Sequence, residues 1–166
     1  RPNRGFIVKI FNKKEVQDHY ILRDALECLA VRLSIQLIND KKIKILLIED
    51  EEMLANMSEV KFKNEGYDLV KAMDGAVGLE MAKSMAPDFI LLDIIMPKMD
   101  GFSVLKSLKE DQSTKNIPVM LLTNLGQDED VQRGKQLGAV GYLVKANITP
   151  SEVVASVKRE LEKLGK

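Results

Sequence analysis

Three carboxylates and one ammonium group in this 166-residue chain follow apolar segments, where their side chains could share one site. Glu49 and Asp50 end one apolar run, Asp93 ends a second and Lys145 ends a third. Carboxylates that lie close together repel one another, which raises the pKa of at least one of them unless a cation is present. Mg²⁺ suits such a site because it takes carboxylate oxygens and keeps a position open for a phosphate oxygen. The residue types therefore predict metal-assisted chemistry on a phosphoryl group.

Several residues of this pattern also have a plainer interpretation. Glu49 and Asp50 can serve only as a helix N-cap and as a partner of the helix dipole. Lys145 can be a solvated charge at the end of a strand. Thr123, which ends a further apolar run, can be an ordinary β-branched strand residue. Their occurrence together favours one shared site over these separate explanations.

A regular alternation of strands and helices follows Lys42 and would position these residues. Strands are expected at the apolar runs 43–48, 67–72, 89–93, 117–123 and 140–145. A helix is expected after each strand, the first from the spacing of Met53, Leu54, Met57 and Val60. Five strands alternating with five helices predict a doubly wound α/β fold with a five-stranded parallel sheet. In such sheets the carboxyl ends of the central strands meet at one crevice, which would bring the five polar residues together.

Residues 1–41 do not share this pattern, so we expect an N-terminal extension ahead of a domain at 42–166. Residues 6–11 predict a short strand and residues 15–38 one long helix. Its leucines recur at heptad-like spacing, at Leu22, Leu26, Leu29 and Leu33. This apolar face is wider than a lone solvated helix needs. The helix is therefore expected to pack on the α/β domain, on another copy or on a partner, unless the segment has no function.

The composition excludes several classes of protein. Lysine plus arginine and aspartate plus glutamate both total 25, so no basic excess points to a nucleic-acid surface. The single cysteine, Cys28, excludes an internal disulfide, and one cysteine with one histidine argues against a zinc site. No apolar run reaches the roughly 18 residues of a membrane span. We expect a cytoplasmic protein without membrane insertion or direct nucleic-acid contact.

From Lys42 onward, about three quarters of the chain, the sequence resembles the receiver domains of bacterial two-component response regulators, chemotaxis regulators among them. The most specific match is the run at 92–101, Leu-Asp-Ile-Ile-Met-Pro-Lys-Met-Asp-Gly. The runs at 48–51, 122–123 and 142–145 match in the same order. The resemblance implies a flavodoxin-like fold of five strands and five helices.

The resemblance also implies a role for each site residue. Asp93 would accept a phosphoryl group from a histidine kinase or phosphotransfer protein in a Mg²⁺-dependent reaction. Thr123 and Lys145 would contact that phosphoryl group, and Tyr142 would change rotamer in concert with Thr123. The protein would be no enzyme toward other substrates and would catalyse only its own phosphoryl transfer and dephosphorylation. The ion would be held by three carboxylates and one backbone carbonyl, those of Glu49, Asp50, Asp93 and Ile95.

Phosphorylation would switch a surface formed by the fourth helix, fifth strand and fifth helix, which would bind an unknown downstream protein. A homodimer through that surface or through the N-terminal helix is a further expectation. Because Lys166 closely follows the fifth helix, we expect no fused output domain. Ala146 stands where many receivers have proline, and Asn124 where a small residue is frequent. We expect these to loosen or re-aim the loop after Lys145 and to tune dephosphorylation.

Other functions stay open at this point. A phosphotransferase or phosphatase could use Asp93 as its nucleophile, but haloacid-dehalogenase-like phosphatases typically carry an acid two residues later, where this chain has Ile95. A silent receiver-like module could act by binding alone, which the intact set of site residues disfavours. Nucleotide binding is disfavoured because no glycine-rich phosphate loop follows the first strand.

Overall fold

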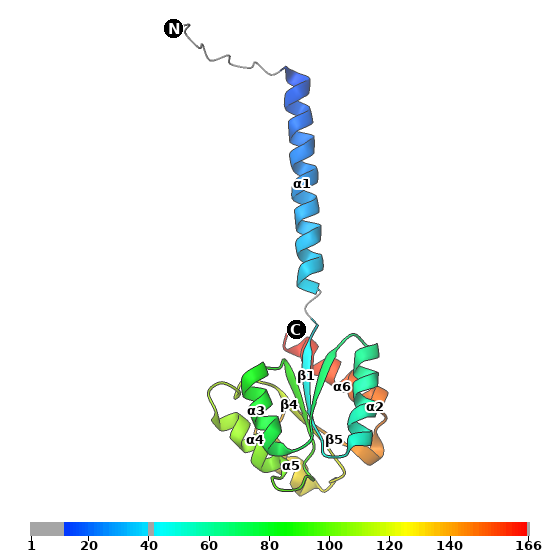
Figure 1. Ribbon diagram of the computed structural model, residues 1–166, viewed down its shortest axis with the longest axis vertical. Helices are drawn as coiled ribbons and strands as arrows, with labels where there is room; N and C mark the ends of the chain where they lie inside the picture. Colours follow the sequence, from blue (N-terminus) through cyan, green and yellow to red (C-terminus); the bar gives the residue numbers. More distant parts are fainter. Residues whose placement is uncertain (1–11, 40–41, 166) are drawn as a thin grey trace. The chain divides into compact units, whose positions relative to one another are not determined.

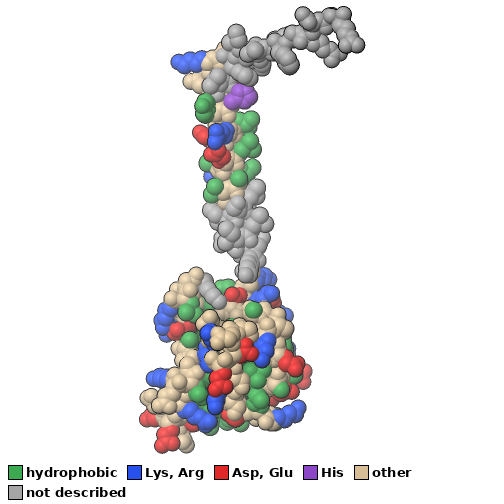
Figure 2. All heavy atoms as spheres, turned by 90° about the vertical axis from the view of Figure 1, so that its left-hand side faces the viewer, with side chains coloured by type: hydrophobic (Ala, Val, Ile, Leu, Met, Phe, Trp, Pro, Cys, Tyr) green, Lys and Arg blue, Asp and Glu red, His purple; other side chains and the backbone are tan. Residues whose placement is uncertain are grey.

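The computed structural model describes residues 12–39 and 42–165 of the chain, and within the first range the side chains of 12–14 and 17–32. The chain divides into two compact units, Arg1–Lys41 and Lys42–Lys166. In the first unit the described residues form one helix, α1 (Lys13–Asn39), which confirms the predicted long helix. The strand predicted over 6–11 lies outside the described residues. Figure 2 shows hydrophobic side chains exposed along α1 beside charged ones.

The second unit is a parallel five-stranded sheet with strand order β2-β1-β3-β4-β5, which confirms the predicted doubly wound fold. Its strands are β1 (Lys44–Ile48), β2 (Asp68–Ala72), β3 (Phe89–Leu92), β4 (Val119–Thr123) and β5 (Gly141–Val144). Its helices are α2 (Glu52–Asn64), α3 (Gly75–Met85), α4 (Gly101–Glu110), α5 (Asp128–Gln136) and α6 (Pro150–Lys163), with a 3₁₀ turn η1 (Lys145–Asn147) after β5. Helices α3, α4 and α5 cover one face of the sheet, and α2 and α6 cover the other (Figure 1).

Both faces of the sheet are buried because its strands are apolar at successive positions. In β1, Leu46 and Ile48 enter the core beneath α3 and α4, while Ile45 and Leu47 enter the core beneath α2 and α6. Each such side chain contributes about 1.5–3 kcal/mol when it is fully buried. The continuous apolar run that predicted a strand is therefore explained by helices on both sides.

Helix α2 forms where the spacing predicts it, but a different face is buried. It places Ala55 and Phe62 in the core, at 0% and 1% exposure. Met53, Met57 and Val60 are instead 65%, 53% and 61% exposed. Helical spacing shows that residues share a face without showing which face meets the sheet, and this helix carries two apolar faces.

Among the described residues, no helix combines the length and hydropathy that crossing a bilayer requires.

Candidate functional site

Four strand ends converge at the carboxyl edge of the sheet. Glu49 follows β1, Asp93 follows β3, Thr123 ends β4 and Lys145 follows β5. The register pairs Ile48 with Leu92, so Glu49 and Asp93 leave neighbouring strands side by side. The structure thus brings Glu49, Asp93 and Lys145 into contact, and it places Thr123 at the end of β4, the strand next to β3.

Three carboxylates gather within this edge. Oxygen atoms of Glu49, Asp50 and Asp93 all lie within 4.8 Å of one another. Glu49 and Asp93 are buried, whereas Asp50 is exposed to solvent. Clustered carboxylate oxygens with one solvent-facing member form the donor set that hard divalent cations such as Mg²⁺ take, with water completing the coordination. The residues present therefore fit such an ion.

Lys145 bridges two of these carboxylates. Its Nζ donates to Oε2 of Glu49 and to Oδ2 of Asp93, each at 2.6 Å. The side chains of Lys145, Glu49 and Asp93 are only 13%, 3% and 7% exposed, so little water solvates the group. One ammonium between two carboxylates leaves a net negative charge, to which Asp50 adds. This excess of negative charge favours binding of a further cation.

Burial and pairing act in opposite directions on these groups. Burial raises the pKa of Glu49, and the ammonium of Lys145 offsets only part of that rise. For Lys145, burial by itself would lower the pKa, but the hydrogen bonds to Asp93 and Glu49 outweigh it and hold the pKa above its ordinary value. Lys145 therefore stays protonated at neutral pH and remains the fixed cation of the site.

The loop after β3 folds back onto Asp93. Oδ1 of Asp93 accepts the backbone N–H of Ile95 at 3.1 Å, and the N–H of Gly101 donates to the carbonyl of Ile94 at 2.9 Å. Asp100 caps α4 by accepting from the N–H groups of Phe102 and Ser103. The hydrogen bond from the Ser103 hydroxyl, together with these backbone bonds, lowers the pKa of Asp100. The Asp-Gly pair of the motif thus starts α4 against the strand end that carries Asp93.

Thr123 and Tyr142 are linked through one residue of the loop after β4. The fully buried Thr123 accepts the N–H of Leu125 on its Oγ1 at 3.4 Å. The hydroxyl of Tyr142 donates to the carbonyl of Leu125 at 3.0 Å. The expected pair therefore holds both sides of Leu125. Sequence reasoning missed Leu125 because its backbone, not its side chain, makes the connection.

The loop after β5 keeps Lys145 aimed at the acids. Lys145, Ala146 and Asn147 form η1, and the capping box of Thr149 and Glu152 begins α6 shortly afterwards. With Ala146 next in the chain, the Lys145 ammonium lies 2.6 Å from an oxygen of each carboxylate.

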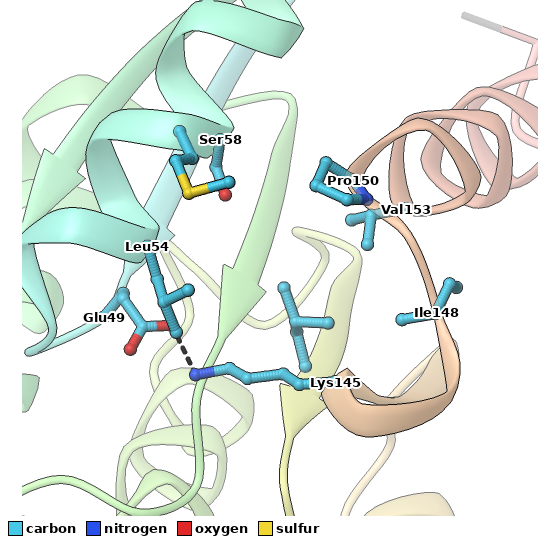
Figure 3. Close-up of a pocket in the computed structure, with 9 residues that line it drawn as sticks. Glu49, Leu54, Ser58, Lys145, Ile148, Pro150 and Val153 are labelled. Atoms are coloured by element: carbon cyan, nitrogen blue, oxygen red, sulfur yellow. Dashed lines mark hydrogen bonds and ion pairs between the residues drawn. The ribbon is translucent and has the colours of Figure 1, made fainter.

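A pocket of about 220 Å³ lies beside Lys145, between α2 and α6. Figure 3 shows Leu54 and Ser58 of α2 facing Pro150, Val153 and Ile148 across it, with the Lys145 ammonium reaching toward Glu49. Its walls are mostly apolar. Sequence reasoning missed this pocket, because it depends on two helices more than eighty residues apart in the chain. Its lining is Glu49, Leu54, Met57, Ser58, Leu122, Lys145, Ile148, Pro150 and Val153.

Comparisons with known proteins agree with this geometry. The family model of the response regulator receiver domain matches residues 45–158. The chain is 38% identical over 120 residues to the DNA-binding dual master transcriptional regulator RpaA of Synechocystis sp., covering 72% of this chain and 49% of the relative. It is 43% identical over 102 residues to the response regulator PleD of Caulobacter vibrioides, covering 61% of this chain and 22% of the relative. The chain thus spans about half the length of the first relative and less of the second.

Solved structures give the same result. The chemotaxis protein CheY4 of Vibrio cholerae is 30% identical with a TM-score of 0.67, over 71% of this chain and 98% of that one. The receiver domain of Francisella response regulator 1452 is 31% identical with a TM-score of 0.69, over 75% of this chain and all of that one (100%).

Proposed function

This chain belongs to the response regulator receiver domain family, and from that membership we propose that Asp93 is its phosphoryl acceptor. The main support for this proposal is the buried ion-pair bridge from Lys145 to Glu49 and Asp93, with Asp50 beside it. This arrangement leaves a carboxylate at a strand end, next to a fixed ammonium and a set of oxygen ligands for a cation. We propose residues 42–166 as the receiver domain and residues 1–41 as an extension.

The proposed reaction needs positioning and charge neutralisation more than covalent help. An oxygen of Asp93 would form the new O–P bond while the P–N bond to a histidine of the donor protein breaks, and the histidine nitrogen would keep that electron pair. Glu49, Asp50, Asp93 and the carbonyl of Ile95 would hold Mg²⁺, which when bound supplies positive charge to the phosphoryl oxygens. The Lys145 ammonium would pair with one of those oxygens. Dephosphorylation of the same aspartyl phosphate would complete the chain's own chemistry.

The output would start at Leu125. A phosphoryl group on Asp93 adds charge and strong acceptor oxygens next to Thr123. A rotation of Thr123 that lets its hydroxyl donate to a phosphoryl oxygen would weaken the long 3.4 Å bond that its oxygen accepts from the Leu125 N–H. In this structure the Leu125 carbonyl accepts from the Tyr142 hydroxyl. When the loop moves, that carbonyl would move with it and shift the conformation of the α5–β5–α6 surface. That surface is where we propose that a downstream protein, or a second copy, binds.

A protein rather than a nucleic acid is proposed as the direct partner of this surface, because acidic and basic residues balance over the chain. RpaA is named a DNA-binding regulator, but the match covers only 49% of it. The cytoplasmic location stays a prediction.

The test is phosphoryl incorporation measured by intact mass after incubation with acetyl phosphate. We expect the wild-type chain to gain one phosphoryl group with Mg²⁺ and none with excess chelator, and Asp93→Asn to gain none under either condition. Asp68→Asn, a change at the amino end of β2, is the matched control and should behave like the wild type.

Equal incorporation by Asp93→Asn would reject Asp93 as the acceptor. No incorporation by the wild type would favour a silent binding module. Release of many phosphates per chain from a small phosphate ester would favour a phosphatase.

The exposed apolar residues of α2, namely Met53, Met57 and Val60, are proposed to dock the phosphoryl donor protein. Met57 also lines the pocket beside Lys145, and Met57 and Val60 line a neighbouring hollow, so a helix of the donor lying along this face would present its phosphohistidine to Asp93. Flexible methionines adapt to such partners.

Met53→Asp should slow transfer from the donor protein about tenfold, because a charge buried in an apolar interface costs more than 1 kcal/mol. The rate at which Met53→Asp incorporates phosphoryl groups from acetyl phosphate should stay within about twofold of the wild-type rate, since α2 keeps its buried face. Val140→Asp, at the amino end of β5, is the control for an added surface charge. A donor that phosphorylates Met53→Asp at the wild-type rate contradicts this docking face.

A further inference from the structure

Helix α1 carries large apolar side chains that the described residues leave exposed. Leu22, Leu26 and Leu29 are 57%, 56% and 51% exposed. All described side chains of α1 are exposed, although large apolar side chains are normally buried. An exposed apolar row of this kind marks an interaction surface.

The leucines are spaced for one kind of partner. Successive separations of four and three residues place Leu26 at an a position and Leu22 and Leu29 at d positions of a heptad repeat, and Leu33 follows at the next a position in the sequence. A seam of this width fits the matching seam of another helix, with knobs entering holes. The four leucines occupy four consecutive core positions within the 27 residues of α1, and His19 and Gln36 occupy the core positions on either side of them.

The flanking charges select the partner and its direction. In this register Asp18 takes a g position and Arg23 the e position of the following heptad, and these two positions face each other across a parallel pair. Both side chains are exposed and carry opposite charges, and Arg23 also donates to Glu27 of its own helix at 2.8 Å. A two-fold axis along the pair would repeat the contact, so the surface is complementary to itself.

The antiparallel alternative matches the leucines but not the charges. It places Arg23 beside Ala30 instead of an acid, whereas Arg32 meets no acid of the other helix in either arrangement. Charge complementarity therefore favours the parallel arrangement and a second copy of this chain as occupant. We propose that α1 pairs with the α1 of a second copy as a parallel, in-register coiled coil.

This inference goes beyond phosphoryl acceptance and does not depend on it. A coiled coil at α1 would tie two receiver domains together in either phosphorylation state. Asp93→Asn should therefore dimerise like the wild type, so a failure of the proposed acceptor and a failure of the proposed dimer can be told apart.

Sedimentation equilibrium of the full chain tests the dimer. The wild type should be dimeric at concentrations where Leu26→Asp is monomeric. The dimer dissociation constant of the wild type should be at least tenfold lower than that of the variant. Val31→Asp is the matched control: Val31 is 58% exposed and lies at the outward f position, so this variant should dimerise normally. A monomeric wild type overturns the proposal, and so does an equal loss of dimerisation in Leu26→Asp and Val31→Asp.

Cysteine cross-linking tests direction and register without relying on a destabilised helix. In a Cys28→Ser background, Leu22→Cys should form an interchain disulfide on mild oxidation. Wild-type Cys28, at an outward c position, should cross-link far less. An equimolar mixture of Leu22→Cys and Leu33→Cys chains should give no mixed disulfide, because only an antiparallel pair brings those positions together. A dominant mixed product would overturn the parallel arrangement.

Discussion

Replacing Gly101 with alanine is expected to lower the free energy of unfolding by about 3 kcal/mol, the upper part of the range for overpacking a tight site. A Cβ at this position would meet the carbonyl oxygen of Asp93 and lie 2.7 Å from Cα of Ile94. These are backbone atoms, so no side chain can rotate away. Alanine would otherwise favour the first turn of α4 by up to about 1 kcal/mol, so a net loss must come from this contact.

Urea denaturation of the variant measures this effect. Gly126→Ala is the matched control, because its Cβ would meet only the methyl groups of Val144 at 3.6 Å, an ordinary contact. That control should lie within about 0.5 kcal/mol of the wild type. Since the clash pushes on the strand end that carries Asp93, the Gly101 variant should also lose acetyl phosphate uptake. If Gly101→Ala and Gly126→Ala had the same free energy of unfolding, the loop after β3 would have relaxed to relieve the clash.

Lys145→Met is expected to cost about 3 kcal/mol of stability at pH 7 without Mg²⁺, because removing one partner of a buried ion pair leaves uncompensated charge. Glu49 and Asp93 would face each other at 3% and 7% exposure with no cation between them. Mg²⁺ should restore more stability to the variant than to the wild type, since it would replace the missing charge. Lys98→Met removes a 78% exposed lysine 3.7 Å from Asp74 and should change little.

The pH dependence of the Lys145 variant follows from the same charges. Burial already raises the pKa of Glu49, and Lys145 is what counteracts that rise. Without Lys145 the folded-state pKa rises further above the unfolded value. The folded state then binds a proton more readily than the unfolded state, so the stability loss is small near pH 4 and grows as pH rises through the folded-state pKa. Chemical denaturation at several pH values would show this; a pH-independent loss would mean that packing, not charge, is responsible.

Much of the site geometry could be predicted because its residues directly follow recognisable strands. Glu49, Asp93 and Lys145 each end an apolar run, and parallel strands bring such ends to one edge. The helix caps also form between close neighbours in the sequence: Asp74 accepts the N–H of Val77, and Thr149 begins α6 with its capping box. These features depend on neighbours in the sequence or on one rule of topology.

What could not be predicted depends on packing between distant elements. Met53 and Phe62 both fit a helical pattern, and only the position of α2 on the sheet decides that Phe62 is buried. The bridge through Leu125 joins backbone atoms to side chains from two strands, which no sequence pattern records.

That bridge couples two sites, the phosphorylation site and the surface that carries Tyr142, through the loop after β4. If the two hydroxyls of Thr123 and Tyr142 hold opposite sides of Leu125, their orientations are coupled through one peptide segment. Coupling of binding free energies is reciprocal. A protein that binds only one orientation of Tyr142 would therefore shift the phosphorylation equilibrium of Asp93 by the same factor by which phosphorylation shifts its binding. The target would act on the signal as well as receive it, and the amount of target in the cell would help set how much of the receiver is phosphorylated.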